Sequence, residues 1–342
     1  MTDLNEKTVS IVIPCRNEVQ FIGKCLQSIV NCTFPKERLT VVVCDGESQD
    51  ESVNIIKQFE DSYPFIHLIN NTHQTTPYAL NLGIKYTQSD VVIILGAHST
   101  IEKDFVERNL EVLFSEEQIG CCGGILTNSY ADENSLIIGF AMSQRFGVGN
   151  AYFRTGDKEG YVDTVAFGAY KREIFEKVGY FDEQLTRNQD DEFNFRLTKA
   201  GYKIYLSKNI QSYYVVRSSY KKLFRQYFQY GYWKVYVNRK HHRITTFRQL
   251  IPFCFVLFLS LGLICSFFSK CAAIIYILVL LGYWGLAFGF SGHRQFTKAQ
   301  RRKVVKSFLI LHLSYGLGYA EGIWDFMICR RNPNQKRTTS SR

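Results

Sequence analysis

Residues 41–50 decide the fold: Val41-Val42-Val43-Cys44-Asp45-Gly46-Glu47-Ser48-Gln49-Asp50. An apolar, strand-like run breaks here into a small turn that carries acids. A second such strand ends at Gly96-Ala97-His98-Ser99. In an open α/β sheet, ligands bind at the carboxyl ends of the strands, where the loops are free of ladder pairing and helix N-termini point into the gap. We therefore expect Asp45, Asp50 and His98 to lie at one ligand crevice.

Strands and helices alternate around this stretch. The pattern predicts strands at 9–14, 39–44, 66–70 and 91–95, and helices at 21–30, 52–59 and 77–86. Such alternation favours parallel βαβ units with right-handed connections and helices on both sheet faces. After residue 120 the pattern becomes rich in glycine and aromatic residues, and helices return near 171–178 and 191–200. The expected fold class is α/β, with a mostly parallel central sheet.

The C-terminal third predicts a membrane region. Residues 249–269 and 271–292 contain no charged side chain, and each run reaches the roughly 20 residues that span a bilayer. Basic clusters at 239–243 and 293–306 flank the pair, which favours a hairpin with both flanks in the cytoplasm over two buried core helices. A third stretch, 304–327, carries ionisable residues and is expected to be interfacial or re-entrant rather than spanning.

These patterns predict a cytoplasmic domain at 1–238, a membrane region at 239–330 and a disordered tail at 331–342. The polar N-terminus predicts neither a signal nor a transit peptide, so we expect a multi-pass protein of the cytoplasmic (inner) membrane whose first domain stays in the cytoplasm. Tyrosine-rich residues 205–238 predict an amphipathic segment on the membrane surface, with an ordinary pair of surface helices as the alternative.

Charge and cysteine content exclude other classes. The net charge is +10, but the basic residues follow the membrane edges rather than one stripe with stacking aromatics, so no nucleic-acid partner is expected. The 10 cysteines show no C-x-x-C pair or metal-binding spacing and are expected to be reduced core residues. Cys44 lies beside Asp45, but no histidine nearby would activate it as a nucleophile.

Two acidic groups are candidates for chemistry. Asp45 and Asp50 could accept hydrogen bonds from a base or ribose, or serve only the turn and the cap of the next helix. The second group is Gln189-Asp190-Asp191-Glu192, followed by Arg196. Three adjacent carboxylates raise at least one pKa and offer a base or metal ligands, and Arg196 can pair with Glu192 along a helix. The alternative is an acid-rich helix start that the helix dipole favours.

The order of the motifs resembles glycosyltransferase family 2 over residues 8–235. The motifs are Pro14-Cys15-Arg16-Asn17-Glu18, Asp45-Gly46-Glu47-Ser48-Gln49-Asp50, Asn81-Leu82-Gly83, Gly168-Ala169-Tyr170, Gly179-Tyr180-Phe181-Asp182, and Asp190-Asp191-Glu192 with Arg196. The membrane hairpin is similar to that of the succinoglycan-type glucosyltransferases, which build bacterial exopolysaccharide on a lipid carrier.

The resemblance implies an A-type, nucleotide-diphosphosugar transferase fold, inversion at the anomeric carbon and a divalent metal, Mn²⁺ or Mg²⁺. Asp190, six residues before Arg196, takes the place of the catalytic aspartate and is the expected base, although Gln189 replaces the usual glutamate before it. The residues implied in nucleotide-sugar binding are Pro14, Arg16, Glu18, Asp45, Ser48, Asp50, Asn81 and Ala97. Those implied in acceptor binding or support are Asp191, Glu192, Arg196, Gln226 and Trp233.

The chain departs from the family at its Asp-x-Asp metal motif, which reads Gly96-Ala97-His98 here. His98 takes the position of the last acid, and a neutral imidazole binds Mn²⁺ but suits Mg²⁺ poorly. Three alternatives remain: a Mn²⁺ site through His98, catalysis with little metal, or a degraded site that binds without turnover. We expect Mn²⁺ to be favoured.

The expected activity is addition of one sugar from a nucleotide-diphosphosugar, by family habit a UDP-sugar, to a polyprenyl-linked glycan acceptor in polysaccharide or glycolipid synthesis, with an assembly complex as a further partner. Residues 225–233 do not match the Gln-x-x-Arg-Trp signature of processive synthases, and two or three apolar runs are too few for a polymer channel. One alternative is a transferase that loads sugar directly onto polyprenyl phosphate. Another is a catalytically silent sugar-nucleotide-binding subunit.

Overall fold

The computed structural model describes residues 4–245 and 247–333. The chain forms two compact units, the first comprising Met1–Asn128 and Tyr152–Val215, and the second Ser129–Ala151 and Val216–Arg342. These units have other limits than the predicted domains, because residues 129–151 and 216–238 belong with the apolar C-terminal helices. The tail predicted to be disordered lies outside the described residues from residue 334 onward.

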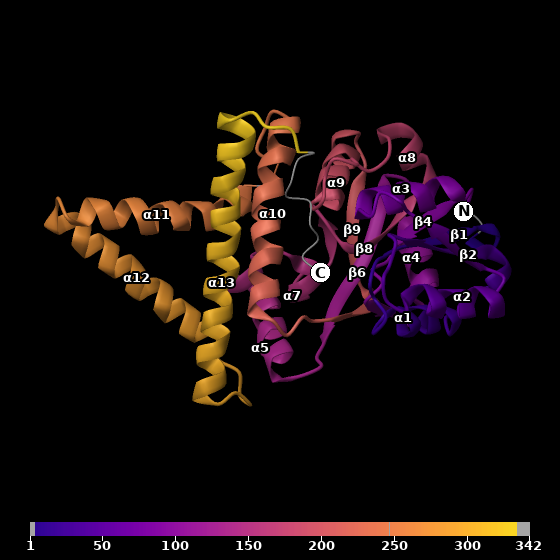
Figure 1. The fold of residues 1–342 in the computed structure, drawn as a ribbon, viewed down its shortest axis with the longest axis horizontal. Helices are drawn as coiled ribbons and strands as arrows, with labels where there is room; N and C mark the ends of the chain where they lie inside the picture. The colour runs from indigo at the N-terminus through magenta and orange to yellow at the C-terminus, as the bar shows by residue number, and fades with distance from the viewer. Residues whose placement is uncertain (1–3, 246, 334–342) are drawn as a thin grey trace. The chain divides into compact units, whose positions relative to one another are not determined.

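Unit 1 is built on a nine-stranded sheet (Figure 1). Eight strands follow the order β3-β2-β1-β4-β8-β6-β9-β5, and the ninth, β7, pairs with β9. The strands are β1 Val9–Cys15, β2 Leu39–Asp45, β3 Ile66–Asn70, β4 Val91–Ile94, β5 Ser99–Ile101, β6 Ile119–Ser129, β7 Gly160–Val162, β8 Ala166–Lys171 and β9 Lys203–Val215. The pairs among β1 to β4 are parallel, whereas β4–β8, β6–β8, β5–β9 and β7–β9 are antiparallel. The α/β class is confirmed, and the sheet is mixed.

Helices cover both faces of this sheet. They are α1 Ile22–Val30, α2 Ser52–Ser62, α3 Thr76–Tyr86, α4 Phe105–Leu113, α7 Tyr152–Thr155, α8 Arg172–Val178 and α9 Gln189–Lys199. Side chains alternate along β1, so Ile11 and Ile13 join one buried cluster with α1 and α4, while Val12 joins another with α3, α8 and α9. Because both faces are buried, the strands read as continuous apolar runs.

The elements predicted before residue 100 are found within a few residues of their expected limits. The prediction for 205–238 is wrong for its first part. Residues up to Val215 form β9, a 13-residue strand of unit 1, and α10 starts only at Tyr220. Successive side chains of β9 point to opposite faces of the sheet, so its tyrosines do not line one face as they would in an amphipathic surface segment.

Gly83 lets α3 lie close to the sheet. A Cβ at this position would lie 2.5 Å from Cγ1 of Val12 and 3.2 Å from Sγ of Cys44. We expect Gly83→Ala to lower the free energy of unfolding by roughly 1–3 kcal/mol, because overpacking displaces buried neighbours. Gly23→Ala in α1 is the control, since the nearest atom, Cγ2 of Ile55, lies at an ordinary 3.4 Å. Thermal unfolding checks this, and equal melting temperatures for the two variants would contradict it.

Unit 2 is helical. Its helices are α5 Glu133–Met142, α6 Arg145–Val148, α10 Tyr220–Lys240, α11 Ile251–Ser266, α12 Lys270–Phe290, α13 Lys298–Gly322 and a π-helix at Ile323–Ile328. The helices Phe247–Ser266 and Lys270–Phe290 are long and apolar enough to cross a membrane, and they form the hairpin drawn as α11 and α12 in Figure 1. Their apolar windows are 0% and 6% buried, which contradicts the alternative of two core helices.

The third apolar stretch forms α13, which packs along α10 within unit 2. Glycines allow the contact: a Cβ on Gly231 would lie 2.0 Å from the carbonyl oxygen of Tyr315, and one on Gly318 would lie 2.0 Å from that of Phe228. Within the described residues, α13 is not among the helices apolar enough to span. Whether this stretch lies at the membrane interface or spans the membrane stays a prediction.

Candidate active site

Asp45 ends β2 and holds its own turn together. The residue is 4% exposed, and its carboxylate accepts hydrogen bonds from the backbone N–H of Ser48 (2.8 Å to Oδ2) and from the Ser48 hydroxyl (2.5 Å to Oδ1). The Ser48 Oγ also accepts the N–H of Asn17 at 2.8 Å. The turn role left open by the sequence is therefore present, and each carboxylate oxygen retains a further lone pair for a ligand.

Asp50 ties the loop after β1 to the start of α2. Its Oδ1 accepts the N–H of Ser52 at 3.0 Å and its Oδ2 that of Val19 at 3.2 Å. Partial burial acts to raise the pKa of Asp50, but the hydrogen bonds from Ser52 and Val19 outweigh it and hold the pKa below the ordinary value. Asp50 is thus an anion that binds the N–H of the first residue of α2, and its expected role in nucleotide-sugar binding stays a prediction.

Pro14 and Arg16 occupy the carboxyl end of β1. Pro14 is buried within the strand and pairs in register with Cys44 of β2. Arg16 lies against Gly46, where a Cβ would be 3.4 Å from the Arg16 Cδ and 3.3 Å from the Cα of Gln74. Three loops, after β1, β2 and β3, therefore meet around Gly46, as expected for parallel strand ends.

His98 lies beside Glu18, although 80 residues separate the two in the sequence. The Nδ1 atom of His98 is 3.5 Å from Oε1 of Glu18, and the two side chains are 19% and 7% exposed. The imidazole also meets the ring of Tyr214 edge to face, with centroids 5.0 Å apart. The loop after β1 thus meets the residues after β4, and a carboxylate and an imidazole lie side by side there.

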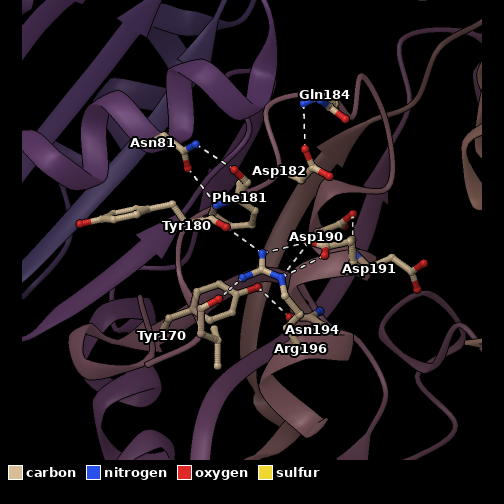
Figure 2. Close-up of polar contacts among 12 residues, drawn as sticks. Asn81, Tyr170, Tyr180, Phe181, Asp182, Gln184, Asp190, Asp191, Asn194 and Arg196 are labelled. Atoms are coloured by element: carbon tan, nitrogen blue, oxygen red, sulfur yellow. Dashed lines mark hydrogen bonds and ion pairs between the residues drawn. The ribbon is translucent and has the colours of Figure 1, made fainter. Parts of the chain in front are cut away.

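Ala97 is packed in the protein core, and Asn81 is hydrogen-bonded to the loop before α9. Ala97 is 1% exposed and belongs to the main hydrophobic cluster, so its side chain offers no surface for a nucleotide sugar. The amide of Asn81 donates to the carbonyl of Phe181 and to Oε1 of Glu183, both at 2.9 Å, and its Oδ1 accepts the N–H of Phe181 at 3.0 Å (Figure 2). Asn81 therefore anchors the loop before α9, and its expected binding role stays a prediction.

The three clustered acids at the start of α9 have different surroundings. Asp190 is exposed, and its Oδ1 accepts the N–H of Asp191 at 2.9 Å. Glu192 is fully buried at 0% exposure. The residue before the helix, Asn188, has a left-handed backbone with φ of 62°, which turns the chain sharply into α9. Helix geometry thus separates one solvent-facing acid from one buried acid.

Arg196 neutralises the buried acid and clamps the preceding loop. Its Nη2 lies 2.9 Å from Oε2 of Glu192, and its Nε donates to Oε1 at 3.0 Å. The same guanidinium donates to the carbonyl oxygens of Val178 and, at 2.7 Å, of Tyr180 (Figure 2). The pairing predicted from the four-residue spacing is confirmed, and it supports the loop that leads toward Asp190.

Tyr170 and Asn194 form a buried layer beneath the acidic helix start that the sequence did not reveal. The Tyr170 hydroxyl donates to Oδ1 of Asn194 at 3.1 Å. Burial raises the pKa of Tyr170, and the charges of Cys121 and Asp190 add to the effect, so the hydroxyl stays protonated. Tyr170 belongs to the sequence motif Gly168-Ala169-Tyr170, but its hydrogen bond to Asn194 depends on how β8 packs against α9.

The two acceptor candidates outside unit 1 have contacts of their own. Gln226 and Trp233 are on α10 in unit 2, where they are 7% and 1% exposed. Gln226 donates to the Tyr230 hydroxyl at 3.0 Å, and Trp233 packs on Phe326. In unit 1, burial raises the pKa of the Cys44 thiol to about 12, so it is protonated and unsuited as a nucleophile.

The sequence matches known proteins over most of its length. The sequence profile of Glycosyl transferase family 2 matches residues 10–179. A dolichyl N-acetyl-alpha-D-glucosaminyl phosphate 3-beta-D-2,3-diacetamido-2,3-dideoxy-beta-D-glucuronosyltransferase of Methanococcus voltae is 34% identical over 75% of this chain and 81% of its own. The succinoglycan biosynthesis protein ExoA of Rhizobium meliloti is 27% identical over 73% of this chain and 76% of its own.

Among solved structures, the mannosyltransferase PcManGT from Pyrobaculum calidifontis, in complex with GDP-Man and Mn²⁺, superposes with a TM-score of 0.66. The alignment covers 93% of this chain and 88% of the mannosyltransferase. The two sequences are 17% identical, so the likeness establishes the fold alone.

Proposed function

Because the chain belongs to glycosyltransferase family 2, we propose that it transfers a single sugar, with inversion, from a nucleotide-diphosphosugar to a saccharide linked to a lipid carrier. The observation that carries the proposal is the sorting of the acids on α9. Glu192 is buried and neutralised by Arg196, whereas Asp190 is exposed at the start of the helix. A base must face its substrate, so Asp190 is the candidate.

The reaction needs one base and a stabilised leaving group. The Asp190 carboxylate takes the proton of the acceptor hydroxyl, whose oxygen attacks the anomeric carbon from the side opposite the diphosphate. The bond between that carbon and the phosphate oxygen breaks, and the nucleoside diphosphate leaves with the electron pair. Asp45, Ser48 and the backbone around Gly46 are the proposed contacts of the nucleotide, with Arg16 beside them.

The acceptor is proposed from the chemistry of the relatives and from unit 2. One relative is named for a dolichyl phosphate-linked sugar, and another for succinoglycan biosynthesis. Two exposed apolar helices in this chain suit a protein that meets its acceptor at a membrane. We place the chain in the cytoplasmic membrane, with unit 1 in the cytoplasm, acting on a polyprenyl-linked glycan within a polysaccharide assembly complex.

Two side chains of unit 1, His98 and Glu18, would suit a divalent cation. No group of three or more His, Cys, Asp or Glu side chains able to hold a metal occurs in residues 4–245 and 247–333. His98 and Glu18 nevertheless place an imidazole beside a carboxylate. This donor set fits Mn²⁺ better than Mg²⁺, with His98 as ligand and Glu18 as the carboxylate that orients its ring. Such a cation would neutralise charge on the diphosphate.

Turnover is therefore expected to be several-fold faster with Mn²⁺ than with Mg²⁺, because imidazole is a poor ligand for Mg²⁺. His98→Asp should shift the preference toward Mg²⁺, and His98→Ala should weaken Mn²⁺ binding measured by electron paramagnetic resonance. Equal rates with both ions, or full activity in a chelator, would contradict the prediction.

The function is tested with purified, detergent-solubilised protein and a panel of sugar nucleotides. Nucleoside diphosphate release is measured with a lipid extract and with the same extract stripped of lipid-linked saccharides. Release that requires both a donor and the lipid-linked saccharide supports the proposal. Release onto bare polyprenyl phosphate would replace it by carrier loading, and donor binding without release would indicate a silent subunit.

A further inference from the structure

Arg154 in α7 of unit 1 carries a guanidinium that lies over two aromatic rings. Its Cζ lies 5.4 Å from the ring centroid of Phe153 and 5.5 Å from that of Tyr214. The Nη1 atom is shielded from solvent and has no hydrogen-bond partner in the part of the chain that the structure describes. The Oγ1 atom of the next residue, Thr155, is likewise buried and has no hydrogen-bond partner among the described residues.

Such an atom points to a missing ligand. Buried polar groups in proteins are almost always hydrogen-bonded, and a guanidinium donates only, so the partner that Nη1 lacks is an acceptor. Arginine stays charged at any physiological pH, which makes an anion the fitting acceptor. The two rings hold the planar group in place and reduce the entropy lost when it binds.

The position of Arg154 indicates which anion its guanidinium would bind. The ring of Tyr214 that contacts the guanidinium also contacts His98, with centroids 5.0 Å apart and planes at 72°. Tyr214 is held there by β9, in which it pairs in register with Ser99 of β5. Arg154 therefore lies one aromatic ring away from the His98 and Glu18 pair, where the diphosphate of the donor is proposed to bind.

We infer that Arg154 binds the diphosphate of the donor and stabilises it as it leaves, an inference that rests on the proposed function. When the bond between the anomeric carbon and the phosphate oxygen breaks, the electron pair and its negative charge stay on the diphosphate. A fixed guanidinium meets that charge with two parallel N–H donors. This stabilisation of the leaving diphosphate matters more here than in a site with an acidic metal motif, because neutral His98 would bind a cation more weakly than a carboxylate would.

The test compares diphosphate with nucleoside binding in the full-length, detergent-solubilised protein. UDP, GDP, ADP and CDP are titrated by calorimetry in EDTA, and the matching nucleosides are followed by saturation-transfer NMR. Arg154→Gln should weaken binding of the preferred diphosphate at least tenfold and leave nucleoside binding unchanged. Arg154→Lys keeps the positive charge but loses the two parallel N–H donors of the guanidinium, so its affinity for the diphosphate should lie between those of the wild type and Arg154→Gln. Arg108→Gln is the control, since Arg108 is a partly exposed arginine on α4 that pairs with Asp104 and Glu111.

Each other outcome overturns the inference in its own way. Equal weakening of diphosphate and nucleoside would make Arg154 a structural residue. Unchanged diphosphate binding with a raised KM for the lipid-linked acceptor alone would assign the guanidinium to the phosphate of the carrier lipid. A wild-type protein that binds none of the four diphosphates, either in EDTA or when the titrations are repeated with Mn²⁺, would instead refute the proposed function, before any variant is compared.

Discussion

Asp190→Asn is expected to lower the turnover number by roughly 100- to 10 000-fold, the usual contribution of a positioned general base. The amide keeps the size of the side chain and can still accept the N–H of Asp191, as the carboxylate does at 2.9 Å. It cannot take up the proton of the acceptor hydroxyl. Because Asp190 is exposed and forms no part of the Glu192–Arg196 pair, the fold should persist, and binding of nucleoside diphosphate should remain within about twofold of wild type.

Single-turnover sugar transfer and calorimetric binding on the same samples measure the two halves of this expectation. Asp61→Asn makes the same chemical change at an exposed carboxylate on α2 and should leave both quantities unchanged. If Asp190→Asn keeps more than a tenth of the wild-type rate, the base lies elsewhere in the site. If donor binding is lost together with turnover, Asp190 contributes to binding or to folding instead.

Glu192→Ala is expected to destabilise unit 1 by roughly 3–5 kcal/mol, the range found when one partner of a buried ion pair is removed. Glu192 is 0% exposed, and its loss leaves the Arg196 guanidinium without its counter-charge, with a side chain only 19% exposed. The melting temperature should fall on the order of 10 °C for a unit of this size. Arg196 also holds the carbonyls of Val178 and Tyr180, so the loop before Asp190 should loosen as well.

Glu173→Ala provides the matched control. This glutamate pairs with Lys177 at 4.0 Å across one turn of α8, but both side chains are about half exposed, at 48% and 57%. Surface pairs of this kind contribute less than about 1 kcal/mol, so the control should melt close to wild type. Melting curves followed by circular dichroism decide the comparison, and similar shifts for both variants would mean that the pair on α9 is no more than a surface contact.

Local sequence patterns predicted the half of unit 1 that is built from short-range units. The apolar runs of β1, β2 and β3 and the amphipathic helices between them can be recognised within windows of about ten residues, because each element shows its own periodicity. The same holds for α11 and α12, whose length without charge is a property of consecutive residues. The four-residue spacing of Glu192 and Arg196 also sufficed to predict their pairing.

The antiparallel half required the tertiary structure. The sequence pattern of β9 resembles an amphipathic surface segment, because the residues of β5 and β7 that pair with it are about 40 to 115 positions away and leave no local signal. The pairing of β9 with β5 places the ring of Tyr214 against His98, and the Arg154 guanidinium contacts the same ring. No sequence motif contained Arg154.

The sequence by itself thus determined the fold class, the parallel strands, the apolar hairpin and the identity of the candidate acids. Only the tertiary structure decided which acid is buried, which hydrogen bonds Asn81 and Asp50 form, and that the Arg154 guanidinium and His98 contact the same tyrosine ring. The physical reason is that periodicity and spacing act between neighbours along the chain. Burial and charge pairing are decided instead by residues that only folding brings together.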